Sequence, residues 1–230
     1  AHMRQKVLCY TIFEGKKPYV VGRRFEADYL EKPTNAHRDA YVKATQRMFQ
    51  KFGDQSIEFA DYADKINRKG ELQRRGIVVS NQNIYKHDPK KFTVKQEGIP
   101  IAVCKSVTMS RHKDAFLVIH THDGSNRDLV LNFGLEIDKL SEFVTVMSQV
   151  FKELTHQDLI IEFSDSVKYN NSAKATKEYA AASSSGAAPS SPRGDVSRSE
   201  DLLIRFEATP KPGQSFFKYG KSGSIIYYLP

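Results

Sequence analysis

One stretch in the second half of the chain carries a strict helical repeat, and this repeat limits the folds open to the whole chain. Between residues 136 and 154 the apolar residues recur every three or four positions: Ile137, Leu140, Phe143, Val144, Met147, Val150, Phe151 and Leu154. This spacing places them on one face of an α-helix. We interpret the face as core rather than as a partner-binding stripe, because so broad an apolar face has to be buried against another layer.

The layer against which this helix packs is predicted from the residues that precede it, where apolar residues recur with the spacing of β-strands. Apolar or alternating runs separated by turn-rich stretches occur at residues 56–62, 75–80, 83–88, 99–110, 115–123 and 128–133. A curved antiparallel sheet leaves an open end that a single helix can cover. We therefore predict an α+β, mainly β fold: a small antiparallel β-sandwich or barrel over residues 55–170, capped by the helix at 136–154.

A leader precedes this predicted core. Residues 4–54 include a helix at 37–52, which we predict because Tyr41, Thr45, Met48 and Phe52 recur with helical spacing. Near the start, Lys6–Phe13 favours a short strand or an apolar anchor. Residues 1–3, Ala-His-Met, are interpreted as a remnant of cloning on a piece of a larger protein.

The core is followed by two segments of different composition. Residues 171–200 are rich in Ser, Ala, Gly and Pro and are predicted to form a flexible loop, because they bury too little apolar surface. Residues 201–230 regain strand character, with a turn expected at 221–223. We expect these strands to return to the same domain and to pair with its main sheet, since an isolated hairpin is marginally stable.

The composition narrows the classes of partner that the chain is expected to bind. The formal charge of +8 favours an acidic partner: nucleic acid, an anionic membrane surface or an acidic protein. The cysteines, Cys9 and Cys104, are too few for a disulfide framework, so we expect free thiols and a cytoplasmic location. No apolar run reaches the roughly 20 residues of a membrane span, so any membrane contact is expected to be peripheral.

The basic residues concentrate in two places. The segment "DKINRKGELQRRG" at 64–76 carries Lys65, Arg68, Lys69, Arg74 and Arg75 on or beside one turn between two strands, and like charges crowded there indicate an anionic ligand. A second group, on the next connection, consists of Lys86, Lys90, Lys91 and Lys95. This second group equally suits a solvated strand edge that resists aggregation.

Three segments carry a family resemblance. "DYL" at 28–30, "FADYADKINRKG" at 59–70 and "NIYKHDPKK" at 83–91 resemble the tail homology 1 domain of class I myosins, over about residues 23–169. The resemblance implies a pleckstrin-homology-like domain with a helical leader, in the tail of a single-headed actin motor with ATPase activity. It also implies that this fragment holds the motor to anionic phospholipids, phosphoinositides and phosphatidylserine among them, at the cytosolic face of the plasma membrane or endosomes and in the actin cortex.

The same resemblance implies which residues meet the lipid. In the family, a basic residue ends the first core strand and a basic-x-Arg tripeptide lies on the second; these positions are Lys65 and Arg75 here. The chain departs from the tripeptide, because Gln73 occupies its first position and Arg74 stands beside Arg75. Since neighbouring strand residues face opposite ways, only one of the two arginines can point into a pocket at the loop.

Charge alone gives modest affinity. Each basic residue near an acidic leaflet contributes about 1 kcal/mol, so five give roughly 5 kcal/mol and a Kd on the order of 10⁻⁴ M. We therefore expect either specific head-group bonds or help from the second group, with Lys65, Arg68, Lys69, Arg74, Arg75, Lys86, Lys90 and Lys91 as the candidate lipid-binding residues.

The sequence is also compatible with other partners and raises the question of a metal site. The same basic surface could bind actin filaments as a protein-interaction module; a nucleic-acid partner is not expected, because no recognition motif accompanies the charge. His120 and His122 share a strand face and could bind a transition metal, but no third ligand has a defined spacing, so no metal is predicted. We expect no catalytic residues and no cofactor, and a monomeric fragment.

Overall fold

The computed structural model describes residues 2–19, 24–67, 71–93, 98–122, 128–134, 136–170, 202–208, 216–219 and 225–229. Within these ranges the helices are α1 (His2–Phe13), α2 (Arg38–Phe52) and α3 (Ile137–Thr155), and a 3-10 turn spans Ile101–Val103. The described part of the chain holds no helix long and apolar enough to cross a membrane.

The larger of two sheets has eight strands in the order β4-β3-β2-β1-β7-β6-β5-β8. Neighbouring strands pair antiparallel, except β5 and β8, which pair parallel. The strands are β1 (Ile57–Ile66), β2 (Leu72–Ser80), β3 (Asn83–His87), β4 (Ile99–Pro100), β5 (Cys104–Met109), β6 (Phe116–Thr121), β7 (Leu129–Asn132) and β8 (Ile160–Phe163).

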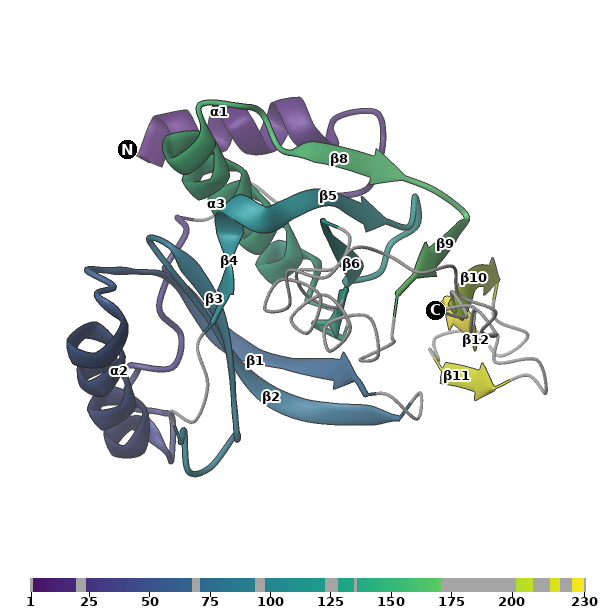
Figure 1. Cartoon of the computed structure of the whole chain (residues 1–230). Coiled ribbons are helices and arrows are strands. Elements are labelled where there is room, and N and C mark those ends of the chain that lie inside the picture. The colour runs from purple at the N-terminus through teal and green to yellow at the C-terminus, as the bar shows by residue number, and fades with distance from the viewer. Residues whose placement is uncertain are drawn as a thin grey trace, which may run out of the picture.

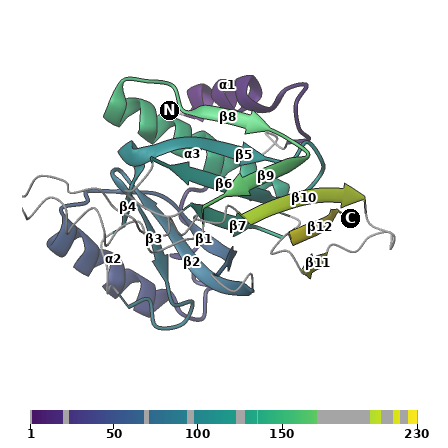
Figure 2. The same ribbon diagram turned by 45° about the vertical axis from the view of Figure 1, so that its right-hand side comes forward.

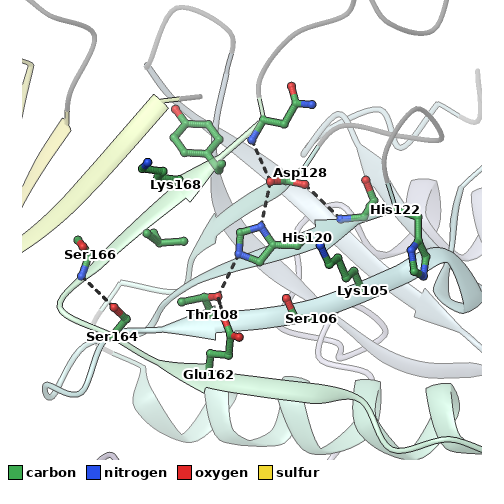
Figure 3. A pocket seen from close by; sticks show the side chains of 14 residues that line it. Lys105, Ser106, Thr108, His120, His122, Asp128, Glu162, Ser164, Ser166 and Lys168 are labelled. Carbon is green, nitrogen blue, oxygen red and sulfur yellow. Dashed lines mark hydrogen bonds and ion pairs between the residues drawn. The ribbon is translucent and has the colours of Figure 1, made fainter. Parts of the chain in front are cut away.

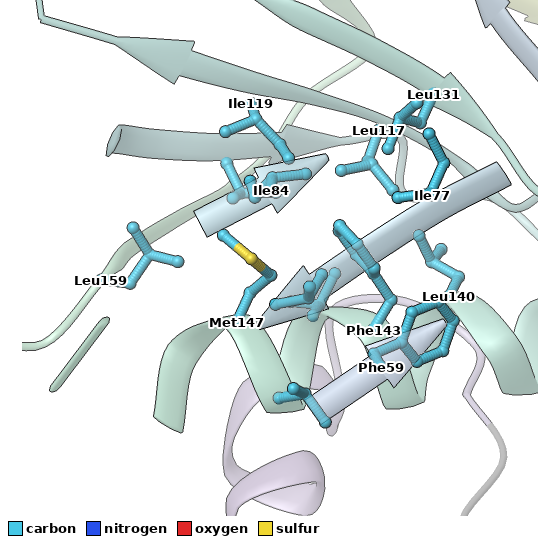
Figure 4. Packing of buried hydrophobic residues seen from close by; sticks show 14 of the residues in the cluster. Phe59, Ile77, Ile84, Leu117, Ile119, Leu131, Leu140, Phe143, Met147 and Leu159 are labelled. Atoms are coloured by element: carbon cyan, nitrogen blue, oxygen red, sulfur yellow. The ribbon is translucent and has the colours of Figure 1, made fainter. Parts of the chain in front are cut away.

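Helix α3 covers the concave side of this sheet. The meanders β1–β2–β3 and β5–β6–β7 join where β1 pairs with β7, and α3 packs between them (Figure 1). In Figure 4, Phe143 and Met147 of α3 point toward sheet residues such as Phe59 and Ile84, and all four are fully buried. The architecture is α+β and mainly β, a largely antiparallel sheet capped by a helix, as predicted from the period changes.

The C-terminal strands form a second sheet. Its order is β11-β12-β10-β9, and its strands are β9 (Ser166–Tyr169), β10 (Leu202–Ala208), β11 (Phe216–Tyr219) and β12 (Ile225–Leu229). The expectation that these strands pair with the main sheet is wrong, because β10 pairs with β9 and β12 instead. Figure 2 shows the second sheet beside the main sheet. Apolar packing joins the two, because Ile204 and Phe206 of β10 lie in one cluster with Phe116 of β6.

The predicted flexible loop at 171–200 and the turn expected at 221–223 lie outside the described residues.

The leader packs on the domain through both of its helices. The strand or apolar anchor expected over Lys6–Phe13 is instead part of α1, which buries Cys9, Ile12 and Phe13 beside α3. Helix α2 lies on the convex side of the sheet, where Tyr41 and Met48 pack in one cluster with residues of β1, β2 and β3. Gly53 ends α2 with φ of 76° and donates its N–H to the Phe49 carbonyl.

Cys9 and Cys104 are buried free thiols, as expected. Both thiols are shielded from solvent, because Cys9 is 0% and Cys104 is 1% exposed.

Candidate functional site

The strand register of the β1–β2 hairpin decides where each cation of the basic loop lies. Lys65 is opposite Gln73, and Asp64 is opposite Arg74. Directly opposed residues share a face of the sheet, and successive residues alternate between faces. Lys65, Gln73 and Arg75 therefore lie on the face that continues into the core residues Ala63 and Ile77, which we call the inner face.

A third basic residue joins this face from β3. Lys86 lies opposite Ile77, so it shares the inner face with Arg75 on the neighbouring strand. Lys86 is exposed, whereas Lys65 and Arg75 are half-buried, as is typical of long basic side chains whose stems lie on a sheet. We call Lys65, Arg75 and Lys86 the inner-face cluster.

Two polar neighbours shape the charge of this cluster. Arg75 donates a hydrogen bond of 2.9 Å from Nη2 to Gln73 Oε1, so the residue that departs from the family pattern supports the guanidinium of Arg75. Asp88 is the nearby carboxylate; its pKa is lowered by hydrogen bonds from the backbone of Lys91 and Lys90, and further by the charges of Arg75 and Lys91. Asp88 is therefore held as a carboxylate at the border of the cluster.

The turn after β3 presents the second basic group. Asp88 Oδ1 accepts the backbone N–H groups of Lys90 and Lys91 at 3.0 and 2.9 Å, which fixes both exposed lysines on a tight turn. Among the described residues neither lysine forms an ion pair. Lys95, and Arg68 and Lys69 of the basic loop, lie outside the described residues.

Phe92 holds this turn against the hairpin. Its ring is 1% exposed and lies directly over Gly76, where an added Cβ would come within 2.5 Å of Phe92 Cε1. The ring also meets Tyr41 of α2 edge to face, with centroids 5.4 Å apart. Phe92 adopts a positive φ of 45°, which is rare for a bulky residue and is maintained here by this burial.

Arg74 lies on the opposite side of the hairpin, in a groove separate from the inner-face cluster. Its guanidinium is 3.7 Å from Asp64 Oδ1 and lies over the Tyr62 ring, 5.6 Å from the centroid. The groove has a volume of about 690 Å³. We call it the outer groove; its lining residues are Tyr29, Lys32, Thr34, Asn35, Ala36, His37, Asp61, Tyr62, Arg74, Pro89, Lys90 and Lys139.

Buried polar contacts hold the walls of the outer groove. On the leader side, Glu142 of α3 accepts the Ala27 N–H at 2.7 Å and the Tyr29 hydroxyl at 2.6 Å. On the floor, the Tyr62 hydroxyl is 3.0 Å from Asn35 Oδ1 and 3.2 Å from the Pro89 carbonyl oxygen. These contacts tie the leader, β1 and the turn after β3 into one surface.

A second cavity, of about 630 Å³, lies between the main sheet and β9 and is mainly polar. Figure 3 shows His120 at its centre: Nδ1 lies 3.0 Å from Asp128 Oδ2, and Nε2 lies 3.0 Å from Thr108 Oγ1. The Thr108 hydroxyl also donates to Glu162, at 3.2 Å. Both ring nitrogens of His120 are thus engaged by protein groups, and no three His, Cys, Asp or Glu side chains in the described ranges are grouped as metal ligands.

The structure separates residues that the sequence placed together. Lys65, Arg75 and Lys86 share one face, whereas Arg74 and Lys90 line the outer groove. The groove residues Tyr29, Asn35 and Tyr62 were not predicted as functional, because the leader's path along β1 is a tertiary feature without a local signal. The alternation rule was the available signal for separating Arg74 from Arg75.

The fold and the site first define a class of protein. It is a small sheet domain that is capped by a helix and carries basic residues toward the end of its first hairpin. The comparisons with known proteins then give the family. Residues 16–205 match the family model described as "Unconventional myosin tail, actin- and lipid-binding". The chain belongs to this family, whose domain is a binding module in the tail of the myosin and not its motor.

The matching relatives are myosin heavy chains. The chain is 47% identical over 171 residues to the Myosin IE heavy chain of Dictyostelium discoideum, covering 74% of this chain and 17% of the relative. It is 32% identical over 234 residues to the Myosin IF heavy chain of the same organism, covering 98% of this chain and 20% of the relative. The chain therefore spans a fifth or less of these relatives.

Solved structures resemble the chain only in part. The N-terminal PH domain of human ARAP2 superposes with a TM-score of 0.35 at 15% identity, over 42% of this chain and 80% of that domain.

Proposed function

We propose that this domain attaches a class I myosin to anionic membranes by binding phosphoinositide head groups with the inner-face cluster. The observation that carries the proposal is the register of β1, β2 and β3, which gives Lys65, Arg75 and Lys86 a common face. Phosphates on an inositol ring are dense anions, and ammonium and guanidinium groups form charge-assisted hydrogen bonds with them. Phosphatidylserine in the same leaflet adds attraction that depends on charge alone.

The cluster lies near the described ends of three strands, which supports a binding surface for a head group. Lys65 and Arg75 flank the β1–β2 connection, and Lys86 precedes the connection from β3 to β4. The pairing of Lys65 with Leu131 brings the start of β7 to the same end of the sheet. Lys91, on the turn held by Phe92, adds an exposed charge near Arg75.

Two neighbouring arginines provide a matched test. Lys65→Ala with Arg75→Ala removes two contacts of about 1 kcal/mol each, so binding to vesicles that contain phosphatidylinositol bisphosphate should weaken about 30-fold. Arg74→Ala removes one positive charge from the other face of β2 and should change binding by about twofold or less. Vesicle cosedimentation measures both. Equal binding by the double variant and the parent would refute the proposal.

Competition distinguishes a head-group site from general attraction to polyanions. Soluble inositol trisphosphate should displace the domain from the vesicles, whereas an oligonucleotide of similar charge should do so poorly. The proposed location is peripheral, at the cytosolic face of a membrane and in the actin cortex beneath it. Stronger displacement by the oligonucleotide would favour nucleic acid over lipid as the partner.

A further inference from the structure

The outer groove differs from the inner-face cluster in the chemistry that it offers. Its lining includes the aromatic residues Tyr29 and Tyr62 together with Pro89 and Ala36, so it presents apolar surface as well as charge. A phosphorylated head group has no apolar part with which to fill such a surface. A peptide does, because an aliphatic or aromatic side chain can lie on the rings while neighbouring groups form polar contacts.

The charges around the groove indicate which net charge such a peptide should carry. Lys139 is held by Asp61 and Glu136, each at 2.5 Å, and Lys32 is paired with Glu26. Arg74 is less firmly compensated, because Asp64 lies 3.7 Å away and the arginine side chain is 55% exposed. Lys90 has no ion pair among the described residues. Arg74 and Lys90 therefore leave positive charge on the rim of the groove.

The groove is also preformed. Glu142 and the Tyr62 hydroxyl fix its walls, and Lys32 and Lys139 lie over the Tyr29 ring at 4.5 and 4.9 Å from its centroid. A fixed groove loses little conformational entropy when a partner binds.

We propose that the outer groove binds an acidic protein segment that carries an apolar anchor residue, and that this segment belongs to the actin filament. The charge on the rim and the apolar floor select an acidic peptide, and the description of the family as actin-binding supplies the filament. The β1–β2 hairpin would then serve two partners: lipid on the inner face through Arg75, and actin on the other face through Arg74. Arg75 and Arg74 lie on opposite faces of β2, so the two partners would contact different side chains of one hairpin.

The test uses the whole chain and filamentous actin without lipid, at an ionic strength of about 0.05 M to limit screening. Arg74→Glu with Lys90→Glu reverses the charge on the rim, and cosedimentation with filaments should fall about tenfold or more. Ala36→Trp fills the groove at an exposed position without changing charge and should also reduce filament binding. The Ala36→Trp variant, whose net charge equals that of the parent, should bind phosphatidylinositol bisphosphate vesicles within about threefold of the parent.

The matched control is Lys65→Glu with Arg75→Glu, which reverses the same number of charges on the inner face. This variant should lose vesicle binding and retain filament binding, and if it retained both, the proposed lipid site would fail while the groove assignment stood. Circular dichroism and thermal unfolding check that each variant folds. Three results would overturn the groove assignment: a parent that does not sediment with filaments, filament binding unchanged in both groove variants, or an Ala36→Trp variant that loses vesicles as strongly as filaments.

Discussion

His87 is a buried histidine at the end of β3, 3% exposed. Its ring stacks on Tyr85 and lies at a tilt to Phe92, with centroids 6.0 and 5.9 Å away. Burial lowers its pKa from the ordinary value of 6.5, and the hydrogen bond to the Thr93 carbonyl opposes this only in part. His87 is therefore neutral in the folded domain at neutral pH.

This lowered pKa predicts a loss of stability in mild acid. As pH falls below 6.5 the unfolded chain takes up a proton at His87 before the folded chain does, so the free energy of unfolding declines until the folded-state pKa is passed. The slope is at most about 1.4 kcal/mol per pH unit. Urea unfolding between pH 7 and 5 should show this decline, and His87→Phe should reduce it. An equally steep decline in the variant would assign the effect to another group.

A buried ion pair fixes the residues that follow α1. Lys17 Nζ lies 3.1 Å from Asp114 Oδ2, and both side chains are fully buried; Lys17 also donates to the His112 carbonyl at 2.5 Å. Lys17→Met would leave the Asp114 carboxylate buried without its cation, which should cost about 3–5 kcal/mol of unfolding free energy. Lys16→Met, at the exposed neighbour, should cost less than about 0.5 kcal/mol. Similar costs for the two variants would mean that the pair adds nothing specific.

At the level of single residues, the sequence indicated the charged candidate positions, but it did not show on which surface of the domain each of them lies. Lys65 and Arg75 follow from the family pattern, and strand alternation separates Arg74 from Arg75. The position of Lys90 beside Arg74 depends on Phe92 packing over Gly76, a contact between residues 16 apart in sequence, and no local pattern encodes it.

Among the elements, the contact between the turn after β3 and strand β2 has a measurable consequence. Gly76→Ala would place a Cβ 2.5 Å from the Phe92 ring, so the ring should be displaced, at a cost of about 1–3 kcal/mol. Amide hydrogen exchange at residues 88–93 should then accelerate. Vesicle binding should weaken although the net charge is unchanged, because the displaced turn carries Lys91. In a chain that already carries Lys91→Ala, the Gly76→Ala substitution should weaken vesicle binding much less. Unchanged exchange at 88–93 would show that Phe92 does not hold the turn.

The elements divide into those with a one-sided apolar pattern and those without one. Helix α3 was predictable because its apolar residues recur on one face, which packs on the sheet. Helix α1 was not, because its apolar residues point both ways: Ile12 and Phe13 are buried near α3, whereas Val7 and Tyr10 are 60% and 55% exposed. The C-terminal strands were recognised as strands, but the pairing of β10 with β9 accompanies the packing of Ile204 and Phe206 against Phe116 of β6, which no local pattern encodes.

At the scale of the whole molecule, the inner-face cluster lies toward the tip of the β1–β2 hairpin, while helix α2 and the second sheet occupy other surfaces (Figures 1 and 2). The central claim is that the inner-face cluster is the head-group site. The outer groove and the polar cavity around His120 are distinct surfaces with different lining residues.

Nuclear magnetic resonance of the arginine Nε–Hε groups tests this claim most directly, because it reports on the two adjacent side chains separately. On titration with inositol trisphosphate, the Arg75 resonance should shift and saturate while the Arg74 resonance changes little; Arg75→Lys and Arg74→Lys assign the two signals. A saturable shift at Arg74 with none at Arg75 would contradict the account.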